Sequence, residues 1–184
     1  DLRLTGTKEG CAEGDCGACT VVLGELRGER VTYRAVNACI QFVAMLEGKA
    51  LITVEGLKGP AGALHPCQQA LVDSHGSQCG FCTPGFVMSL YAAHVGEARP
   101  SRPRINDILA GNLCRCTGYG PIVQAAESMY DHDAPAWDVA RRAREDKLLR
   151  RISRRDTVAL EHAGQRFFSP ATVRMSSLTS TFTS

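Results

Sequence analysis

The sequence predicts an α+β protein in which a β-rich first part precedes a helical part. Runs of β-branched and aromatic residues separated by glycines occupy the first fifty positions, whereas from residue 64 the apolar residues recur at helical spacing. The chain has 184 residues, 44% of them hydrophobic and 22% charged, which suits one or two small domains. This composition excludes the wholly disordered and collagen-like classes.

Strand signals come first along the chain. Residues 20–23 (TVVL) and 31–33 (VTY) are typical of strands and have glycines between them, so they predict a hairpin. Residues 51–54 (LITV) predict a later strand, and the glycines and proline of residues 56–62 predict a linker. We therefore expect a first domain over residues 1–56.

Four helices follow in the prediction. Proline or glycine marks most of their ends: Thr83 and Pro84 open the second helix, and Gly111 ends the third. Four helices joined by short connections predict a compact all-α bundle, a second domain over residues 63–131. The expected helices span residues 64–74, 84–94, 105–110 and 121–129.

The last part, residues 132–184, has weaker signals. Residues 140–152 suit a helix. Residues 141–155 contain eight basic and two acidic residues, a net charge of +6, so the rest of the chain has a net charge of −4 and the whole chain +2. We expect a solvated basic helix or linker there. Residues 165–170 suggest a new element that does not develop, and residues 176–184 contain seven Ser or Thr, which predicts a disordered tail.

Charge and hydropathy argue against nucleic acid and the membrane as partners. A mildly acidic body with one basic segment does not suit nucleic-acid binding. No apolar run approaches the roughly 18 residues of a membrane span. The chain begins at Asp1 without a basic-then-apolar leader, so we expect a cytoplasmic protein.

The nine cysteines are the main chemical signal. All lie between Cys11 and Cys116, and most are closely grouped. This grouping is typical of metal ligands, whereas disulfide cysteines are usually spread along a chain. The odd number also favours metal-bound thiolates in a reducing compartment. The five histidines have no metal-binding spacing, and no catalytic triad, phosphate loop or dinucleotide fingerprint is present. We therefore expect electron transfer and no catalytic residue in this chain.

The first cysteine group is a C-x4-C-x2-C run with a distant fourth member. Cys11, Cys16 and Cys19 are followed by Cys39, and this is the plant-type spacing for a [2Fe–2S] cluster. The glycines of the run allow the backbone to wrap a cluster and to point N–H groups at sulfur. A zinc site is the alternative, because zinc ligands have similar spacings.

The second group consists of two pairs that each precede a helix start. Cys79 and Cys82 lie before the second predicted helix, and Cys114 and Cys116 before the fourth. Helix N-termini lower thiolate pKa values and favour an anionic cluster. Zinc again remains the alternative. Cys67 is left over, and we expect it to be a buried free thiol on an apolar helix face.

Several long motifs carry a family resemblance. The runs TGTKEGCAEGDCGACTVV, NAC, ITVEGL, LHPCQQA, GSQCGFCTPGFVMS and GNLCRCTGYGPI resemble, in this order, the iron–sulfur region of the molybdenum hydroxylases. The resemblance covers about residues 4–129. The wording GTKEGC and EGDCGACT is most similar to the xanthine dehydrogenase branch, while aldehyde oxidoreductases and carbon monoxide dehydrogenases share the second-group motifs.

The resemblance implies a β-grasp, ferredoxin-like domain for the first cluster and a helical domain for the second. It implies that substrate is hydroxylated at a molybdopterin-binding large subunit and that electrons pass through both clusters to FAD and NAD. Cys79, Cys82, Cys114 and Cys116 would hold the cluster next to molybdopterin, with Gln78 and Cys116 in contact with the pterin. The other cluster would face the FAD-binding domain.

The sequence departs from the family at both ends. The family's β-grasp domain has a strand hairpin and a helix ahead of the first cluster loop, so the resemblance implies a truncated domain with a labile first cluster. Residues 166–173 (RFFSPATV) resemble the start of the family's FAD domain, but agreement stops near Arg174. We therefore expect that this chain by itself binds neither FAD nor molybdopterin.

Overall fold

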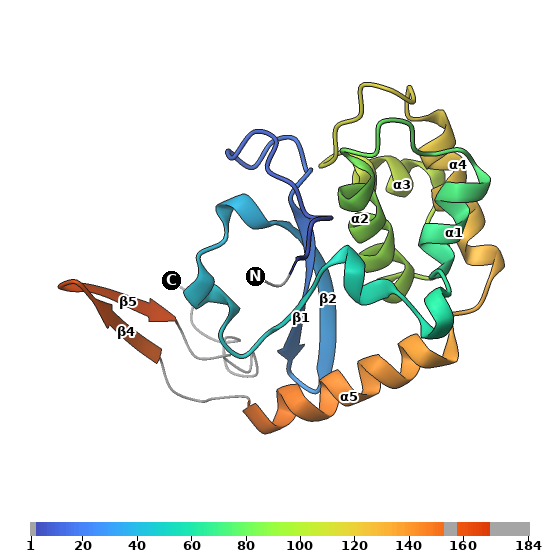
Figure 1. The fold of residues 1–184 in the computed structure, drawn as a ribbon. Helices are drawn as coiled ribbons and strands as arrows, with labels where there is room; N and C mark the ends of the chain where they lie inside the picture. The colour runs from blue at the N-terminus through green and yellow to red at the C-terminus, as the bar shows by residue number, and fades with distance from the viewer. Residues whose placement is uncertain (1–2, 153–157, 170–184) are drawn as a thin grey trace, which may run out of the picture.

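A small antiparallel sheet lies beside a group of helices, which confirms the predicted α+β class. The computed structural model describes residues 3–152 and 158–169 (Figure 1). The sheet part comprises residues 3–57, and the helical part comprises residues 64–131. A further helix runs below both parts, from the helices to the far end of the sheet (Figure 1).

The sheet has the strand order β2-β1-β3. β1 (Thr20–Arg27) and β2 (Arg30–Asn37) form the predicted hairpin, whose two-residue turn begins at Gly28 with a φ of +60°. Both strands are longer than the sequence pattern predicts. β3 (Ala50–Ile52) pairs antiparallel with β1 and ends at Ile52, because the chain then enters a 3₁₀ turn over Val54–Leu57.

The four predicted helices are all present. They are α1 (Pro66–Asp73), α2 (Thr83–Gly96), α3 (Arg102–Leu109) and α4 (Gly120–Ser128). Each has a proline in its first two positions, where the missing N–H is not needed. α3 begins three residues before the predicted start, because Ser101 and Pro103 supply a helix start upstream of the apolar residues.

One hydrophobic core joins the sheet part and the helical part. α2 is buried along most of its length and packs on β1, β2, α1 and α3. Val22 and Ile52 of the sheet belong to the same buried cluster as Phe86 and Tyr91 of α2. The position of α2 therefore fixes how the two parts are oriented.

The basic segment forms a helix, but it is not solvated on all sides. α5 (Ala136–Ile152) begins at Ala136, and its Asp138 and Leu149 are buried against the body of the protein. The Tyr33 hydroxyl on β2 donates a hydrogen bond to Glu145 at 2.9 Å. The expected solvated helix or linker is therefore a helix that is exposed on its outer face, while Glu145 and Asp138 bind partners on β2 and α2.

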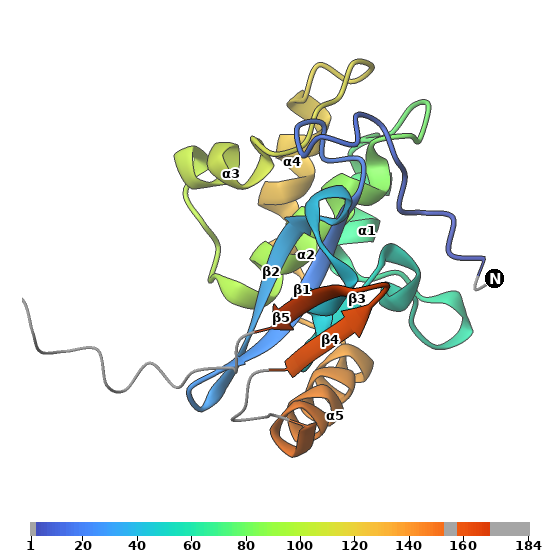
Figure 2. The ribbon, with the colours of Figure 1, turned by 90° about the vertical axis from the view of Figure 1, so that its left-hand side faces the viewer.

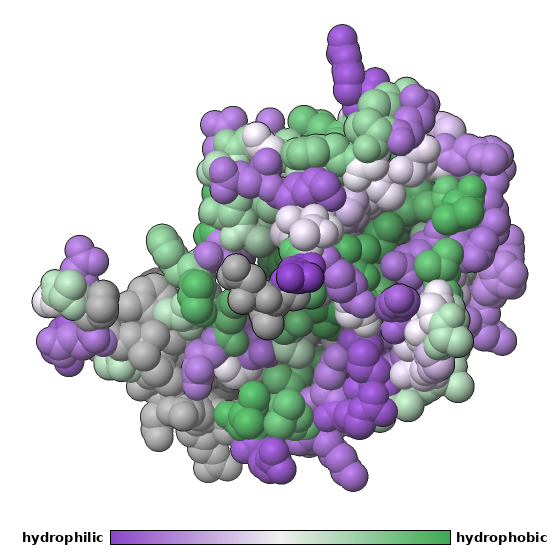
Figure 3. All heavy atoms as spheres, in the orientation of Figure 1, coloured by the Kyte–Doolittle hydropathy of each residue, from purple (hydrophilic) through white to green (hydrophobic). Residues whose placement is uncertain are grey.

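The outer face of α5 does carry the expected charge. Figure 3 shows hydrophilic residues along this part of the surface and an apolar area near the end of α5, where Leu148 and Ile152 are exposed. Arg150 donates to the Glu29 carbonyl of the β1–β2 turn at 2.6 Å, which ties this end of the helix to the sheet.

A second hairpin follows α5. β4 (Val158–His162) and β5 (Gln165–Ser169) pair antiparallel around Ala163 and Gly164, which both have positive φ, and β5 contacts the 3₁₀ turn Val43–Leu46. In Figure 2 the hairpin lies in front of the three-stranded sheet. The expectation that no element develops here is wrong, while the predicted tail over residues 176–184 lies outside the described residues. Within the described ranges, none of the helices has the length and apolarity to cross a membrane.

Candidate metal centres

The first cysteine group lies on a loop ahead of β1 and on the turn after β2. The Cys16 backbone N–H donates to Cys11 Sγ at 3.4 Å, and the Cys39 N–H donates to Cys19 Sγ at 3.5 Å. The β1–β2 pairing causes this meeting, because the register sets Thr20 opposite Asn37 and so brings the neighbours Cys19 and Cys39 to one end of the hairpin. The four thiols come together as two close pairs.

Glycines allow the loop to fold tightly over this group. Gly14 has a φ of +82° and Gly17 one of +72°, a region that other residues rarely adopt. A Cβ atom on Gly10 would lie 2.8 Å from Cys16 Sγ. Asn37 Nδ2 donates to the Gly14 carbonyl at 2.5 Å and holds the loop against the end of β2.

The loop backbone also sets the acidity of the first group. N–H groups of Cys16, Glu13 and Asp15 point at Cys11 and lower its pKa to about 7. The hydrogen bond with the Cys19 thiol raises the pKa of Cys39. The loop thus stabilises negative charge on sulfur, which is the form that binds metal.

The second cysteine group lies between two loops of the helical part. Cys79 and Cys82 precede α2, and Cys114 and Cys116 lie between α3 and α4. Cys116 Sγ is 3.5 Å from Cys79 Sγ, and the Cys82 and Cys114 thiols form a second hydrogen-bonded pair. Cys79 and Cys116 are exposed, whereas the other pair is half-buried.

Each pair of the second group combines one more acidic and one less acidic thiol. The Phe81 N–H, followed by the Cys116 thiol, lowers the pKa of Cys79, and the hydrogen bond with Cys79 raises that of Cys116. Burial raises the pKa of Cys82 to about 12. Burial also acts on Cys114, but hydrogen bonds, led by that of the Thr117 hydroxyl, outweigh it and lower its pKa.

Two residues of this loop were missed by the sequence reasoning. The Cys114 N–H donates to the Tyr119 hydroxyl at 2.9 Å, and Thr117 Oγ1 lies 3.2 Å from Cys114 Sγ. Tyr119 adopts a φ of +68° immediately before α4. The run TGYG after Cys116 is the signal that could have indicated a turn closing on the thiols.

Gln78 lies beside Cys116 on the exposed side of this group. Its Nε2 donates to the Cys116 carbonyl at 3.1 Å, although the two residues are 38 positions apart. The two residues named from the resemblance therefore share one exposed edge.

The two groups are adjacent to each other. The Leu113 N–H donates to the Cys16 carbonyl at 3.0 Å, so one hydrogen bond joins the residue before Cys114 to a cysteine of the first group. Phe81, beside Cys82, lies near Gly10 of the first loop. The fold therefore brings eight of the nine cysteines to one end of the molecule, at the junction of its two parts.

Cys67 lies elsewhere, in the core of the helical part. It is fully buried on α1, its Sγ is 3.1 Å from His65 Nδ1, and burial raises its pKa. This is the predicted place for a free thiol. Among the residues that the structure describes, no three His, Cys, Asp or Glu side chains are spaced to hold a single metal ion.

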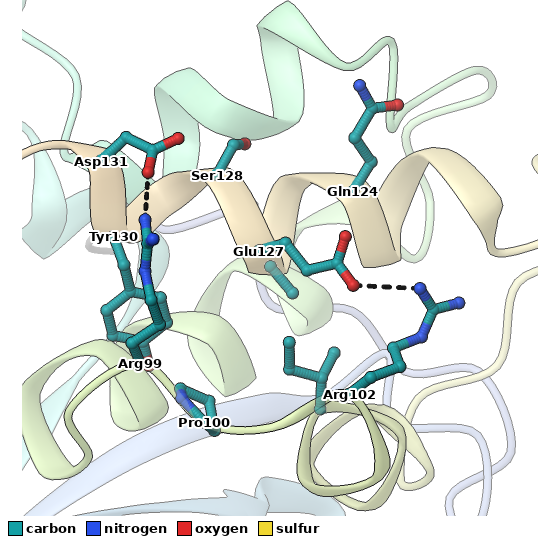
Figure 4. A pocket seen from close by; sticks show the side chains of 10 residues that line it. Arg99, Pro100, Arg102, Gln124, Glu127, Ser128, Tyr130 and Asp131 are labelled. Carbon is teal, nitrogen blue, oxygen red and sulfur yellow. Dashed lines mark hydrogen bonds and ion pairs between the residues drawn. The ribbon is translucent and has the colours of Figure 1, made fainter.

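A surface pocket of about 380 Å³ lies away from the cysteines, between the α2–α3 connection and α4. Two ion pairs cross it, Arg99 with Asp131 and Arg102 with Glu127 (Figure 4). Because each arginine already has a carboxylate partner, the pocket offers no free charge.

Comparison with known proteins gives a family model for the helical part and relatives that match about two thirds of the chain. Residues 53–127 match the family model of the [2Fe-2S] binding domain. The chain is 52% identical over 128 residues to xanthine dehydrogenase 1 of Arabidopsis thaliana, and 47% identical over 129 residues to aldehyde oxidase 3 of Mus musculus. These matches cover 68% and 69% of this chain but only 9% and 10% of the relatives. The chain thus spans about a tenth of the length of these relatives.

Solved structures extend the comparison to the fold. The crystal structure of quinoline 2-oxidoreductase from Pseudomonas putida 86 matches with a TM-score of 0.60 and 34% identity, over 70% of this chain and 75% of that one. Aldehyde oxidoreductase from Desulfovibrio gigas matches with a TM-score of 0.59 and 37% identity, over 79% of this chain and 15% of that one. The 34% identity extends over three quarters of the quinoline 2-oxidoreductase chain. The protein therefore belongs to the molybdenum hydroxylase family, which includes xanthine dehydrogenase and aldehyde oxidase, and it corresponds to the iron–sulfur region of that family.

Proposed function

We propose that this chain is the electron-transfer part of a xanthine dehydrogenase. In this proposal it passes electrons from a molybdopterin site, where xanthine or hypoxanthine is hydroxylated, through two [2Fe–2S] clusters to FAD and NAD. The observation that carries the proposal is the junction of the two cysteine groups, where the Cys16 carbonyl accepts a hydrogen bond from the Leu113 N–H at 3.0 Å. Two redox centres in series need such proximity, whereas two independent structural metals do not.

The donor sets fit the clusters. A [2Fe–2S] cluster takes four cysteine thiolates for its two irons, and each group offers four thiols arranged as two hydrogen-bonded pairs. We assign the first cluster to Cys11, Cys16, Cys19 and Cys39, and the second to Cys79, Cys82, Cys114 and Cys116. The clusters would supply one-electron chemistry, and the chain's own residues would hold them and donate N–H groups to sulfur.

The exposed side of the second group suits the molybdenum partner. Gln78 and Cys116 lie together and are both exposed, so they can contact the pterin of a molybdopterin-binding large subunit. The first group would face an FAD-binding domain. The corresponding division of the chain is residues 1–56 for the first cluster, 63–131 for the second and 132–184 for the connection onward. Because thiolate ligands persist where thiols are kept reduced, we place this protein in the cytoplasm.

A second candidate is the iron–sulfur part of another molybdenum hydroxylase, acting on an aldehyde or an N-heterocycle. The similar identities to xanthine dehydrogenase 1, 52%, and to aldehyde oxidase 3, 47%, support it. The relatives named quinoline 2-oxidoreductase and aldehyde oxidoreductase support it as well. Substrate choice lies in the molybdenum-containing part, so a turnover assay of the complete enzyme with xanthine and with an aldehyde separates the two.

Metal and sulfide analysis tests the electron-transfer role. We expect about four iron and four acid-labile sulfide per chain, with visible absorption that bleaches on reduction. A colourless protein that contains zinc and no sulfide would overturn the proposal in favour of a zinc-stabilised interaction module.

Two matched cysteine variants test the ligand assignment. Cys116→Ser removes a proposed ligand, so we expect loss or distortion of the second cluster and about half of the iron. Cys67→Ser changes the same atom in the core, 3.1 Å from His65 and outside both groups, and should keep all of the iron. Loss of iron in Cys67→Ser, or full iron in Cys116→Ser with an unchanged spectrum, would contradict the assignment.

A further inference from the structure

A buried asparagine lies where the loops of the two cysteine groups meet. Asn112 follows α3, precedes Cys114 by two residues and is only 3% exposed. It is not one of the proposed ligands, and nothing in the cysteine spacing points to it.

All three strong hydrogen bonds of the Asn112 side chain are buried. Its Oδ1 accepts from the Ser89 hydroxyl of α2 at 2.6 Å. Its Nδ2 donates to the Gly17 carbonyl and to Thr20 Oγ1, each at 3.0 Å. The amide is thus anchored on the helical part by its oxygen, and it binds the sheet part by its nitrogen.

The nitrogen of Asn112 binds the end of the first cysteine loop and the start of β1. Gly17 lies between Cys16 and Cys19, and its carbonyl also accepts from the Thr20 hydroxyl at 2.6 Å. The neighbouring Cys16 carbonyl accepts from the Leu113 N–H at 3.0 Å. Successive residues of one cysteine loop therefore bind successive residues of the other.

The packing around this contact leaves no room for the loops to slide. A Cβ atom on Gly17 would lie 2.2 Å from the Gly111 carbonyl, and one on Gly85 of α2 would lie 2.2 Å from the Gly17 carbonyl. Buried polar groups that lose a partner cannot recruit water in so tight a place. The Asn112 amide is therefore the polar element that holds the two loops in one register.

We propose that Asn112 is a positioning residue that sets the placement of the two clusters relative to each other, and with it their electronic coupling. This inference rests on the proposed function. It assigns to the asparagine no contact with a cluster and no part in holding iron. The inference predicts that a one-atom change at residue 112 alters the magnetic interaction between the clusters and leaves each cluster itself unchanged.

The test is low-temperature EPR of the 184-residue chain with both clusters loaded and chemically reduced. In the wild-type chain we expect two signals split by their mutual magnetic interaction. Asn112→Asp replaces the donating nitrogen by an oxygen that faces the Gly17 carbonyl, and it keeps the acceptor for Ser89. We expect the resolved splitting of the two signals to be lost, while the g values of each cluster and the iron content are retained.

Asn106→Asp is the matched control. It makes the same one-atom, one-charge change on an exposed residue of the helical part, whose side chain accepts a hydrogen bond from Arg102 at 3.4 Å. It should leave the splitting unchanged. If Asn112→Asp does not fold, Thr20→Val replaces it, because this change removes one acceptor of the Asn112 nitrogen and should also cause loss of the resolved splitting.

The outcomes separate this inference from the proposed function. Wild-type splitting in folded Asn112→Asp or Thr20→Val, or an equal loss in Asn106→Asp, would overturn the positioning role and leave the two-cluster function intact. A wild-type chain that takes up no reducible cluster would overturn the proposed function itself.

Discussion

His65 shows how strongly a single residue depends on its surroundings in this fold. It caps α1, is fully buried, and has the rings of Tyr91, His94 and Trp137 around it. Its Nε2 lies 3.9 Å from Asp138 Oδ2. Burial outweighs the attraction of that carboxylate and lowers the pKa of His65 to about 4.

We predict that this histidine makes the chain sensitive to acid. In the unfolded chain its pKa is about 6.5, so between pH 6.5 and 4 the unfolded state binds a proton that the folded state does not. Stability from this residue is complete above pH 6.5 and is lost as the pH falls, by about 2 kcal/mol between pH 7 and pH 5. Urea unfolding at both pH values measures the loss.

His65→Asn should flatten this dependence, because asparagine still caps the helix but does not titrate. His132→Asn, at an exposed histidine, should keep the wild-type slope. An unchanged slope in His65→Asn would show that another group causes the acid sensitivity.

At the scale of elements, α5 is held to the body by contacts at both of its ends. Asp138 near its start is bound by Arg141 and Arg142 and accepts from the Tyr91 hydroxyl of α2 at 3.2 Å. Leu149 near its end is 2% exposed. The helix therefore connects α2 to the sheet and does not act as a free spacer.

We predict that α5 contributes to global stability through Leu149. Leu149→Ala removes a buried side chain and should cost about 2–4 kcal/mol of the free energy of unfolding. Leu148→Ala is the matched control, because its neighbouring side chain is 47% exposed and the loss should stay within about 0.5 kcal/mol. Chemical denaturation of both variants gives the comparison, and equal effects would mean that α5 is not packed as described.

At the scale of the whole molecule, the sheet part and the helical part meet through a close backbone contact. Gly85 on α2 faces the Gly17 carbonyl, and a Cβ atom there would come within 2.2 Å of that oxygen. Since this carbonyl oxygen belongs to the backbone, it has no rotamer by which to move away. The approach of the two parts requires glycine at residue 85.

We predict that Gly85→Ala forces the two parts to separate locally and destabilises the chain by about 1–3 kcal/mol. Gly96→Ala on the same helix meets nothing within 4 Å and should be neutral, or stabilising by up to about 1 kcal/mol. Thermal unfolding of the two variants checks this. Equal midpoints would rule out a tight junction.

The sequence predicts the elements that depend on interactions between residues close together in the chain, and it does not predict those that depend on distant residues. The β1–β2 hairpin and the four helices up to residue 128 were predicted, because turn residues and apolar spacing act within a few positions. The packing of α5 was not, since the burial of Asp138 depends on Tyr91 and His65, which lie far away in the chain. The β4–β5 hairpin was missed because its two strands are short, five residues each.

The sequence by itself determined the chemical inventory of this protein: two groups of four cysteines at ligand spacing, glycines that let their loops fold, and the motifs of the family. These are local features, and their assignment as ligands stays a prediction. Only the tertiary structure decided that the two groups adjoin, that Asn112 joins their loops, and that α5 packs on β2 and α2. Its contacts join residues 92 to 112 positions apart, and no spacing along a chain can specify which distant groups the core brings together.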